Sequence, residues 1–173
     1  MANLDSAIIG VVAAIVQLIV GLALAMGSVF IGLKMFDRLT KNIDEWSEIK
    51  KGNVAVGIVM AAVIFAIANV VQSGVVQITS GLSANQEVGK MLTALLIGFI
   101  NLAIGLVAAV ISVWIAIKVL DRITTDIEEM EELAKGNVAV AIVMAGVLIA
   151  VSFVIGSAVS GISNALNPTT LGL

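Results

Sequence analysis

Residues 51–61 read KGNVAVGIVMA, and residues 135–145 read KGNVAVAIVMA. Each stretch follows a charged segment and opens a long apolar one, and a shift of 84 residues superimposes the two without a gap. The same shift brings Lys34, Asp37, Arg38, Thr40, Ile43, Glu45 and Glu48 onto Lys118, Asp121, Arg122, Thr124, Ile127, Glu129 and Glu132. Self-similarity at a fixed period predicts a duplicated structural unit.

The composition of the chain indicates a membrane protein. Of its 173 residues, 60% are hydrophobic and 12% are charged, and the mean hydropathy is +1.16. Soluble domains are about half apolar and about a quarter charged. Four apolar segments, 7–34, 54–80, 91–117 and 138–163, each exceed the roughly 20 residues that cross a bilayer core. We therefore predict an all-α fold with four transmembrane helices, the first being too long for a signal peptide.

The repeat and the basic residues together predict the topology. Residues 1–86 form a first two-helix unit and 87–173 a second; because each holds two spans, both enter the membrane in the same sense, as a parallel repeat. Eight of the nine lysines and arginines flank the two charged loops, and only Lys90 lies on the other side. The positive-inside rule then places the charged loops in the cytoplasm and both termini outside, in a cell (inner) membrane.

Each charged loop is predicted to contain a cytoplasmic amphipathic helix. Phe36, Leu39, Ile43 and Trp46 recur at three- and four-residue steps, which is helical spacing, and Trp46 suits the headgroup depth of the interface. Thr40 and Thr124 are candidate N-caps for these helices. Gly52 and Gly136 can adopt the left-handed conformation that ends a helix, and Asn53 and Asn137 can cap the next span.

The carboxylates of these loops allow two interpretations. Asp44, Glu45 and Glu48 could form a cation site or a docking surface for a cytoplasmic protein. Alternatively, they form a solvated helix face with pairs such as Glu48 to Lys51, which is the commoner role of a charge run. The repeated pairs Asp37–Arg38 and Asp121–Arg122 lie where the spans leave the hydrocarbon, and we interpret them as interfacial anchors.

Small and amide residues form a stripe along each span. The first span carries Gly10, Ala14, Gln17, Gly21, Ala25, Ser28 and Gly32, and the third carries Ala94, Gly98, Asn101, Gly105, Ala109, Ser112 and Ala116 at the same positions. The second span offers Ala55, Ala62, Ala66, Asn69 and Ser73, and the fourth Ala139, Gly146, Ala150 and Ser157. Helices in lipid associate through close backbone approach, so these stripes predict packing faces.

Four amides within the spans are the candidate functional residues of the membrane region: Gln17, Asn69, Gln72 and Asn101. They either line a polar path or bond across helix pairs, and the stripes favour the second role. No Asp, Glu, Lys or Arg lies deep in a span, which argues against a proton relay, a voltage sensor or an ion-coupled pump. With no histidine or cysteine and a net charge of −3, we expect no enzyme activity, no metal, no cofactor and no nucleic-acid partner.

These motifs resemble a known family. The Asp-Arg-[Leu/Ile]-Thr exit of the first span, the acidic helix, and Lys-Gly-Asn-Val-Ala-Val opening the next span are similar to the YjfL-like family of small inner-membrane proteins, which are often tandem copies of this unit. The resemblance implies a multi-pass membrane protein and no established activity. The matching positions are Asp37, Thr40, Glu48, Gly52, Asn53 and Ala55, with Asp121, Thr124, Glu132, Gly136, Asn137 and Ala139. Where family members have proline after the threonine, this chain has Lys41 and Thr125, so one continuous helix stays an alternative there.

Two functions are consistent with the sequence. Small residues on every span give a four-helix unit more packing surface than it satisfies alone, which predicts a homo-oligomer in the lipid bilayer that forms a passive channel or transporter. The alternative is a structural scaffold that docks a cytoplasmic protein partner through its acidic helices and transports nothing.

Overall fold

A computed structural model describes residues 2–39, 44–82, 88–124 and 128–166. Within these ranges the chain forms six α-helices and no strand. The helices are α1 (Ala2–Leu39), α2 (Glu45–Lys50), α3 (Val54–Gly81), α4 (Val88–Ile123), α5 (Glu129–Ala134) and α6 (Val138–Ala165).

Four of these helices, α1, α3, α4 and α6, are long and apolar enough to cross a membrane. They contain the four predicted spans, so the all-α fold and the spans are confirmed. α3 and α6 each have 28 residues, and at 1.5 Å per residue each is about 42 Å long. That exceeds a hydrocarbon core of about 30 Å, so the helices tilt or project beyond it.

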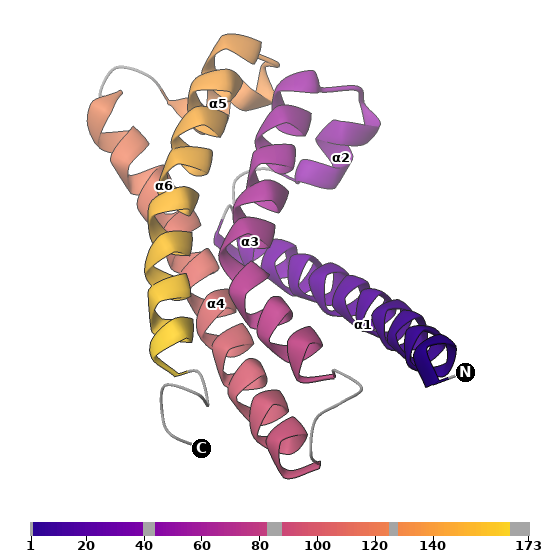
Figure 1. Ribbon diagram of the computed structural model, residues 1–173. Helices are drawn as coiled ribbons and strands as arrows, with labels where there is room; N and C mark the ends of the chain where they lie inside the picture. Colours follow the sequence, from indigo (N-terminus) through magenta and orange to yellow (C-terminus); the bar gives the residue numbers. More distant parts are fainter. Residues whose placement is uncertain (1, 40–43, 83–87, 125–127, 167–173) are drawn as a thin grey trace.

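α3 is the central helix of the bundle. It packs against α1, α4 and α6, and α4 also packs against α6 (Figure 1). Over its most apolar 18 residues, 56% of α3 is buried, whereas none of the corresponding part of α1 is. The core is built from short side chains such as Val63, Ile67 and Val70, which are 0 to 1% exposed.

α1 packs on the bundle near its C-terminal end and diverges from it toward its N-terminus. Ser28 and Gly32 near its C-terminal end are buried, and a Cβ at Gly32 would lie 2.6 Å from Cδ1 of Ile67 in α3. Gly10, Ala14 and Leu18 are exposed, and the N-terminal half of α1 diverges from the other helices (Figure 1). The first-span stripe therefore packs only in its C-terminal half.

The third-span stripe packs as predicted. Gly98, Asn101, Gly105, Ala109, Ser112 and Ala116 are all buried. A Cβ at Gly105 would lie 3.2 Å from the Cα of Val71, and one at Gly74 of α3 would lie 2.5 Å from the Cα of Leu102. Close approach of the α3 and α4 backbones thus requires glycine on both helices.

The fourth-span prediction is wrong. Ala139, Gly146, Ala150 and Ser157 are all exposed, because α6 turns a different face toward its neighbours. That face consists of Ala141, Met144, Leu148, Ser152, Gly156, Val159 and Ser163. The larger side chains on it fill space between helices that the small stripe would leave empty.

The charged segments form short separate helices, whose N-cap positions are occupied by Asp44 and Glu128. α2 has six residues and is capped by Asp44, whose side chain accepts from the Ser47 amide at 3.1 Å. Phe36 and Leu39 belong to α1 instead, and Thr40 lies outside the described residues. Thr124 directs its hydroxyl backward to the Leu120 carbonyl at 2.8 Å, and Glu128 occupies the N-cap position of α5.

Candidate functional site

Two tight turns connect the short helices to the spans that follow. Gly52 and Gly136 have φ of +83° and +82°, a left-handed conformation that glycine adopts without steric cost. Asn53 then caps α3 by accepting from the Val56 amide at 3.2 Å, and Asn137 caps α6 by accepting from the Ala139 amide at 3.1 Å. The predicted roles of both glycines and both asparagines are confirmed.

Asn53 also connects the two turns. Its Nδ2 donates to Glu48 Oε2 at 3.0 Å and to the carbonyl of Leu133, at the end of α5, at 2.9 Å. Asn137 Nδ2 donates to Glu132 Oε2 at 2.8 Å. Asn53 therefore closes its own turn and holds α5 against the start of α3.

Ion pairs complete each turn. Lys51 Nζ lies 2.7 Å from Glu48 Oε1, and Lys135 Nζ lies 2.9 Å from Glu132 Oε1. The hydrogen bond from Lys51, followed by that from Asn53, holds the pKa of Glu48 below its ordinary value. Asn137 and then Lys135 lower the pKa of Glu132 in the same way, and the two lysines have raised pKa values because of their carboxylate partners.

These shifts predict that the turns weaken in acid. A lowered folded-state pKa contributes stability that is complete above the unfolded-state pKa and is lost as pH falls through the folded-state value. We expect Lys51→Met to raise the titration midpoint of Glu48, followed by the NMR shift of its carboxyl carbon in micelles. Lys135→Met is the matched control and should leave the Glu48 midpoint in place; equal midpoints in all three proteins would contradict the assignment.

Glu45 and Glu129 differ from the solvated face that the sequence predicts. They are only 7% and 8% exposed, because the first turns of α2 and α5 fold back onto the spans. Glu45 lines a cavity of about 20 Å³ with Phe36, Val56 and Met60. Glu129 lines one of about 240 Å³, and among the described residues its Oε1 has no hydrogen-bond partner.

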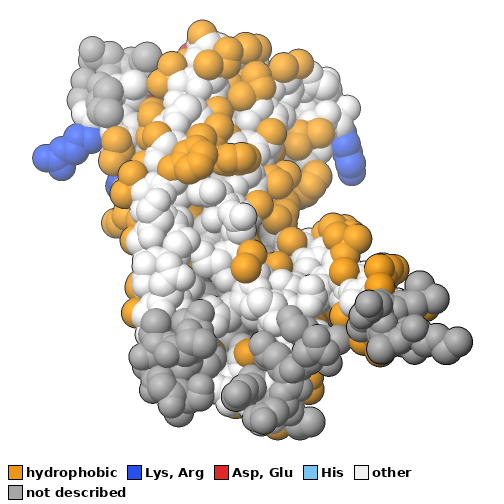
Figure 2. Space-filling model, in the orientation of Figure 1, with side chains coloured by type: hydrophobic (Ala, Val, Ile, Leu, Met, Phe, Trp, Pro, Cys, Tyr) orange, Lys and Arg blue, Asp and Glu red, His pale blue; other side chains and the backbone are white. Residues whose placement is uncertain are grey.

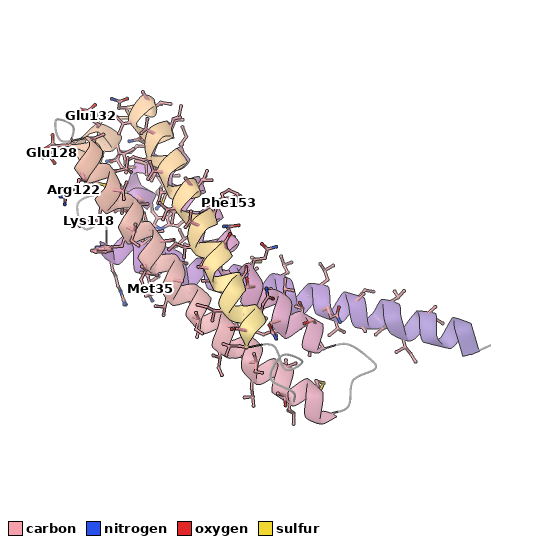
Figure 3. The ribbon with its side chains drawn as sticks, turned by 60° about the vertical axis from the view of Figure 1, so that its left-hand side comes forward. Met35, Lys118, Arg122, Glu128, Glu132 and Phe153 are labelled. Atoms are coloured by element: carbon pink, nitrogen blue, oxygen red, sulfur yellow. The ribbon has the colours of Figure 1, made fainter. Side chains whose placement is uncertain are left out.

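The remaining charges of the loops lie on the surface. Asp37, Arg38 and Arg122 are exposed, and within the described part of the chain no ion pair joins them; the Asp121 side chain lies outside it. Figure 3 shows Lys118 and Arg122 directed outward from α4 near the end that carries α5. In the same described residues, no three His, Cys, Asp or Glu gather as a metal site.

Two of the four intramembrane amides have partners that indicate packing. Asn69 Nδ2 of α3 donates to the Ser152 carbonyl of α6 at 3.0 Å. Asn101 is 1% exposed, and its Nδ2 lies 3.4 Å from Gln77 Oε1, while its Oδ1 has no partner among the described residues. Gln17 is half-buried on α1. The structure does not bring Gln17 together with Asn69 and Gln72.

Gln72 is exposed and, together with Asn69, lines an open groove. The groove runs between α3 and α6, has a volume of about 440 Å³, and is lined by Asn69, Gln72, Phe153, Gly156, Ser157, Ser160, Gly161 and Asn164. Ser73 and Ser160 join the two helices beside it through hydroxyls 2.7 Å apart. Figure 3 places Phe153 on the side of α6 away from α4.

The groove includes two polar residues that the sequence reasoning missed, Ser160 and Asn164. They follow Gly156 at steps of four, so all three lie on one face of α6, and that spacing was the available signal. On the face shown in Figure 2, the visible Lys and Arg lie only in the upper part. None of the residues that line the groove is charged, so the groove is polar without being charged.

Comparison with protein families gives one match. The model of a Domain of Unknown Function, DUF350, matches residues 10–115 and again residues 91–173. No curated protein and no solved structure matches the chain.

Proposed function

We propose that this chain, which belongs to the DUF350 family, assembles into a homo-oligomer that forms a passive path for small polar solutes across the membrane. The observation that supports this most directly is the groove between α3 and α6. It begins at Asn69 and Gln72, well inside α3, and ends at Asn164, near the C-terminal end of α6; both helices can span a membrane, yet amides and hydroxyls line the groove. Polar groups at such a depth normally face water or protein, because each unsatisfied one costs several kcal/mol in hydrocarbon.

The groove is turned away from α4. Gln72 and Gly74 lie on one helix, and at 100° per residue they point about 160° apart. Gly74 meets the backbone of α4, so Gln72 faces nearly the opposite direction. A second copy that covers this side would turn an open groove into an enclosed polar passage.

A vesicle assay tests the proposal. Purified protein in lipid vesicles should make them permeable to glycerol, followed by light scattering after an osmotic step. Gln72→Leu removes an amide from the groove and should lower that permeability. Thr79→Val is the control, because the Thr79 hydroxyl bonds carbonyls of its own helix outside the groove and valine keeps its shape.

The outcomes separate clearly. If vesicles that hold folded wild-type protein are no more permeable to glycerol than protein-free vesicles, the passive path is rejected. Equal permeability of the Gln72→Leu and wild-type proteins would show that solute takes another route. The path involves no covalent step, in keeping with the expectation that the protein is not an enzyme.

The proposal includes the duplication and the orientation. Residues 1–86 and 87–173 are two copies of one unit, of the YjfL-like kind, which the double family match supports. α2 and α5 lie on the cytoplasmic side of the inner membrane and the termini outside, which the distribution of lysine and arginine supports. Labelling of single cysteines at positions 89 and 131, which are exposed and lie outside the four candidate spans, from either side of intact cells tests this orientation.

The scaffold alternative is less well supported. Its predicted docking residues include Glu45 and Glu129, which are buried and unavailable to a partner in solution. Exposed acidic side chains at Asp44, Glu128 and Glu131 remain, and co-purification of one cytoplasmic protein that is lost on their replacement would favour it.

A further inference from the structure

The contact between the two units is one-sided. Equivalent positions lie 84 residues apart but differ in burial. One set of positions is buried on α6 and exposed on α3, and another set is buried on α3 and exposed on α6. The first set, called the back face, consists of Leu148, Ser152 and Gly156 on α6 and Ile64, Ala68 and Gln72 on α3. The second, the front face, consists of Ala66, Val70 and Gly74 on α3 and Ala150, Val154 and Ala158 on α6. The front of the first unit thus contacts the back of the second, and two faces stay open.

The two cavities below α2 and α5 show the same one-sidedness. Phe36, Val56, Val59 and Met60 line the cavity of the first unit, and their equivalents Leu120, Val140, Val143 and Met144 line that of the second. Met130 and Leu133 of α5 close the first, leaving about 20 Å³. Their equivalents on α2 are Trp46 and Ile49, which are 52% and 36% exposed and do not line the second cavity, of about 240 Å³.

The residues that form the α3–α4 contact have equivalents on α6 and α1, and these equivalents are exposed. Within the chain, Gly74 meets Leu102, Ile78 meets Gly98, and Gly81 meets Ala94. The equivalent pairs are Ala158 with Leu18, Ile162 with Ala14, and Ala165 with Gly10. All six of these residues are exposed. In the last pair glycine and alanine have exchanged helices, so the combined size at the contact is kept.

We propose that these open surfaces bind each other in a second copy of the chain. The diverging N-terminal half of α1 packs on α6 of a neighbouring copy as α4 packs on α3, and Trp46 and Ile49 fill that copy's cavity as Met130 and Leu133 fill the first. The inference rests on the homo-oligomer proposed above and names its interface. The occupant is a copy of the same chain because the interface between the units supplies the equivalent residue at every one of these positions. Ala158 and Ala14 stand where that interface has Gly74 and Gly98, so α6 and α1 of the neighbouring copy lie farther apart than α3 and α4.

The geometry has a consequence for the assembly. A head-to-tail contact gives a ring when the rotation between units closes, and a filament when it does not. Copies that share one bilayer repeat around an axis along its normal, so the assembly is a ring where that rotation is a whole fraction of a turn. In this assembly the back face of α3, which includes Gln72, meets the front face of α6 in the neighbouring copy.

Disulfide cross-linking tests the interface directly, because the chain has no cysteine of its own. Leu18→Cys and Ala158→Cys are made in separate, differently tagged copies, which are expressed together and oxidised in native membranes. Both side chains are exposed, so neither replacement disturbs the fold of one copy. We expect a disulfide-linked dimer that carries both tags and no dimer when either variant is expressed alone.

The control replaces Leu18→Cys by Val16→Cys, which is also exposed but points about 160° away around α1. It should give no mixed dimer with Ala158→Cys. Ile49→Cys with Val143→Cys tests the cavity in the same way and should cross-link between copies.

Two results would overturn the inference. One is the absence of mixed dimers for both pairs in folded protein; the other is a link that forms only when both cysteines lie in one chain, which would mean that α1 closes onto its own α6. Glycerol permeability is measured separately. If the protein cross-links but its vesicles are impermeable to glycerol, the passive path is rejected and the interface stands. If the vesicles are permeable but the protein does not cross-link, the interface is rejected and the passive path stands.

Discussion

Gly74→Ala is expected to lower the stability of the bundle by about 1–3 kcal/mol, the usual cost of overpacking a well-filled interior. A Cβ at this position would lie 2.5 Å from both the Cα and the amide nitrogen of Leu102 and 3.0 Å from the carbonyl carbon of Asn101. These are backbone atoms of α4 and have no rotamer that moves them aside. The helices must therefore separate, which weakens the contacts on both sides of the substitution.

Gly57→Ala is the matched control on the same helix. A Cβ there meets nothing within 4 Å, and the equivalent position of the second unit is already alanine, Ala141. Since alanine also favours a helix by up to about 1 kcal/mol over glycine, Gly57→Ala should unfold at the same temperature as the wild type or higher. Thermal unfolding in detergent, followed by circular dichroism, compares the proteins, and equal losses at both positions would contradict the close contact of α3 and α4.

Asn53→Ala is expected to destabilise the protein more than Asn137→Ala. Each replacement removes an N-cap, which costs about 1 kcal/mol, together with a bond to the glutamate of its own turn. Asn53 alone also bonds the Leu133 carbonyl across to α5, and loss of that bond adds about 0.5–1.5 kcal/mol. Unfolding by SDS in mixed micelles measures the difference.

Asn53→Ser divides the effect into its parts. Serine keeps an oxygen that caps α3 but is too short to reach α5, so it should recover the cap and not the cross-link between the turns. If Asn53→Ala and Asn137→Ala unfolded at the same SDS fraction, the bond to Leu133 would contribute nothing to stability.

The sequence contained enough to predict local structure, because local structure here depends on residues close together in the chain. Uninterrupted apolar segments define the spans, and Lys-Gly-Asn defines both turns through a left-handed glycine and a capping asparagine. The stripe on α4 was also predictable, since only small residues permit backbones as close as those of Gly105 and Val71. These features need no knowledge of the neighbouring helices.

What depended on the neighbours could not be predicted. Ala139, Gly146, Ala150 and Ser157 form a small-residue stripe as regular as the others, yet α6 buries a different face. The two halves are alike in sequence, whereas the packing of the helices gives them unlike surroundings. For the same reason the burial of Glu45 and Glu129 and the contribution of Ser160 and Asn164 to the groove were missed.

The central position of α3 affects how the protein is made. α3 is the second of the four long helices to be synthesised, but two of the three long helices that it packs against, α4 and α6, follow it. The 84 residues between Gly81 and Ala165 take about 4–17 seconds at the usual 5–20 residues per second of translation. Until α4 is complete, α3 is inserted with its glycine-lined face toward lipid, where a helix satisfies its own backbone groups. Assembly of the bundle is therefore complete only after the last helix leaves the ribosome, and a truncation within α6 would leave α3 packed on α1 and α4 alone.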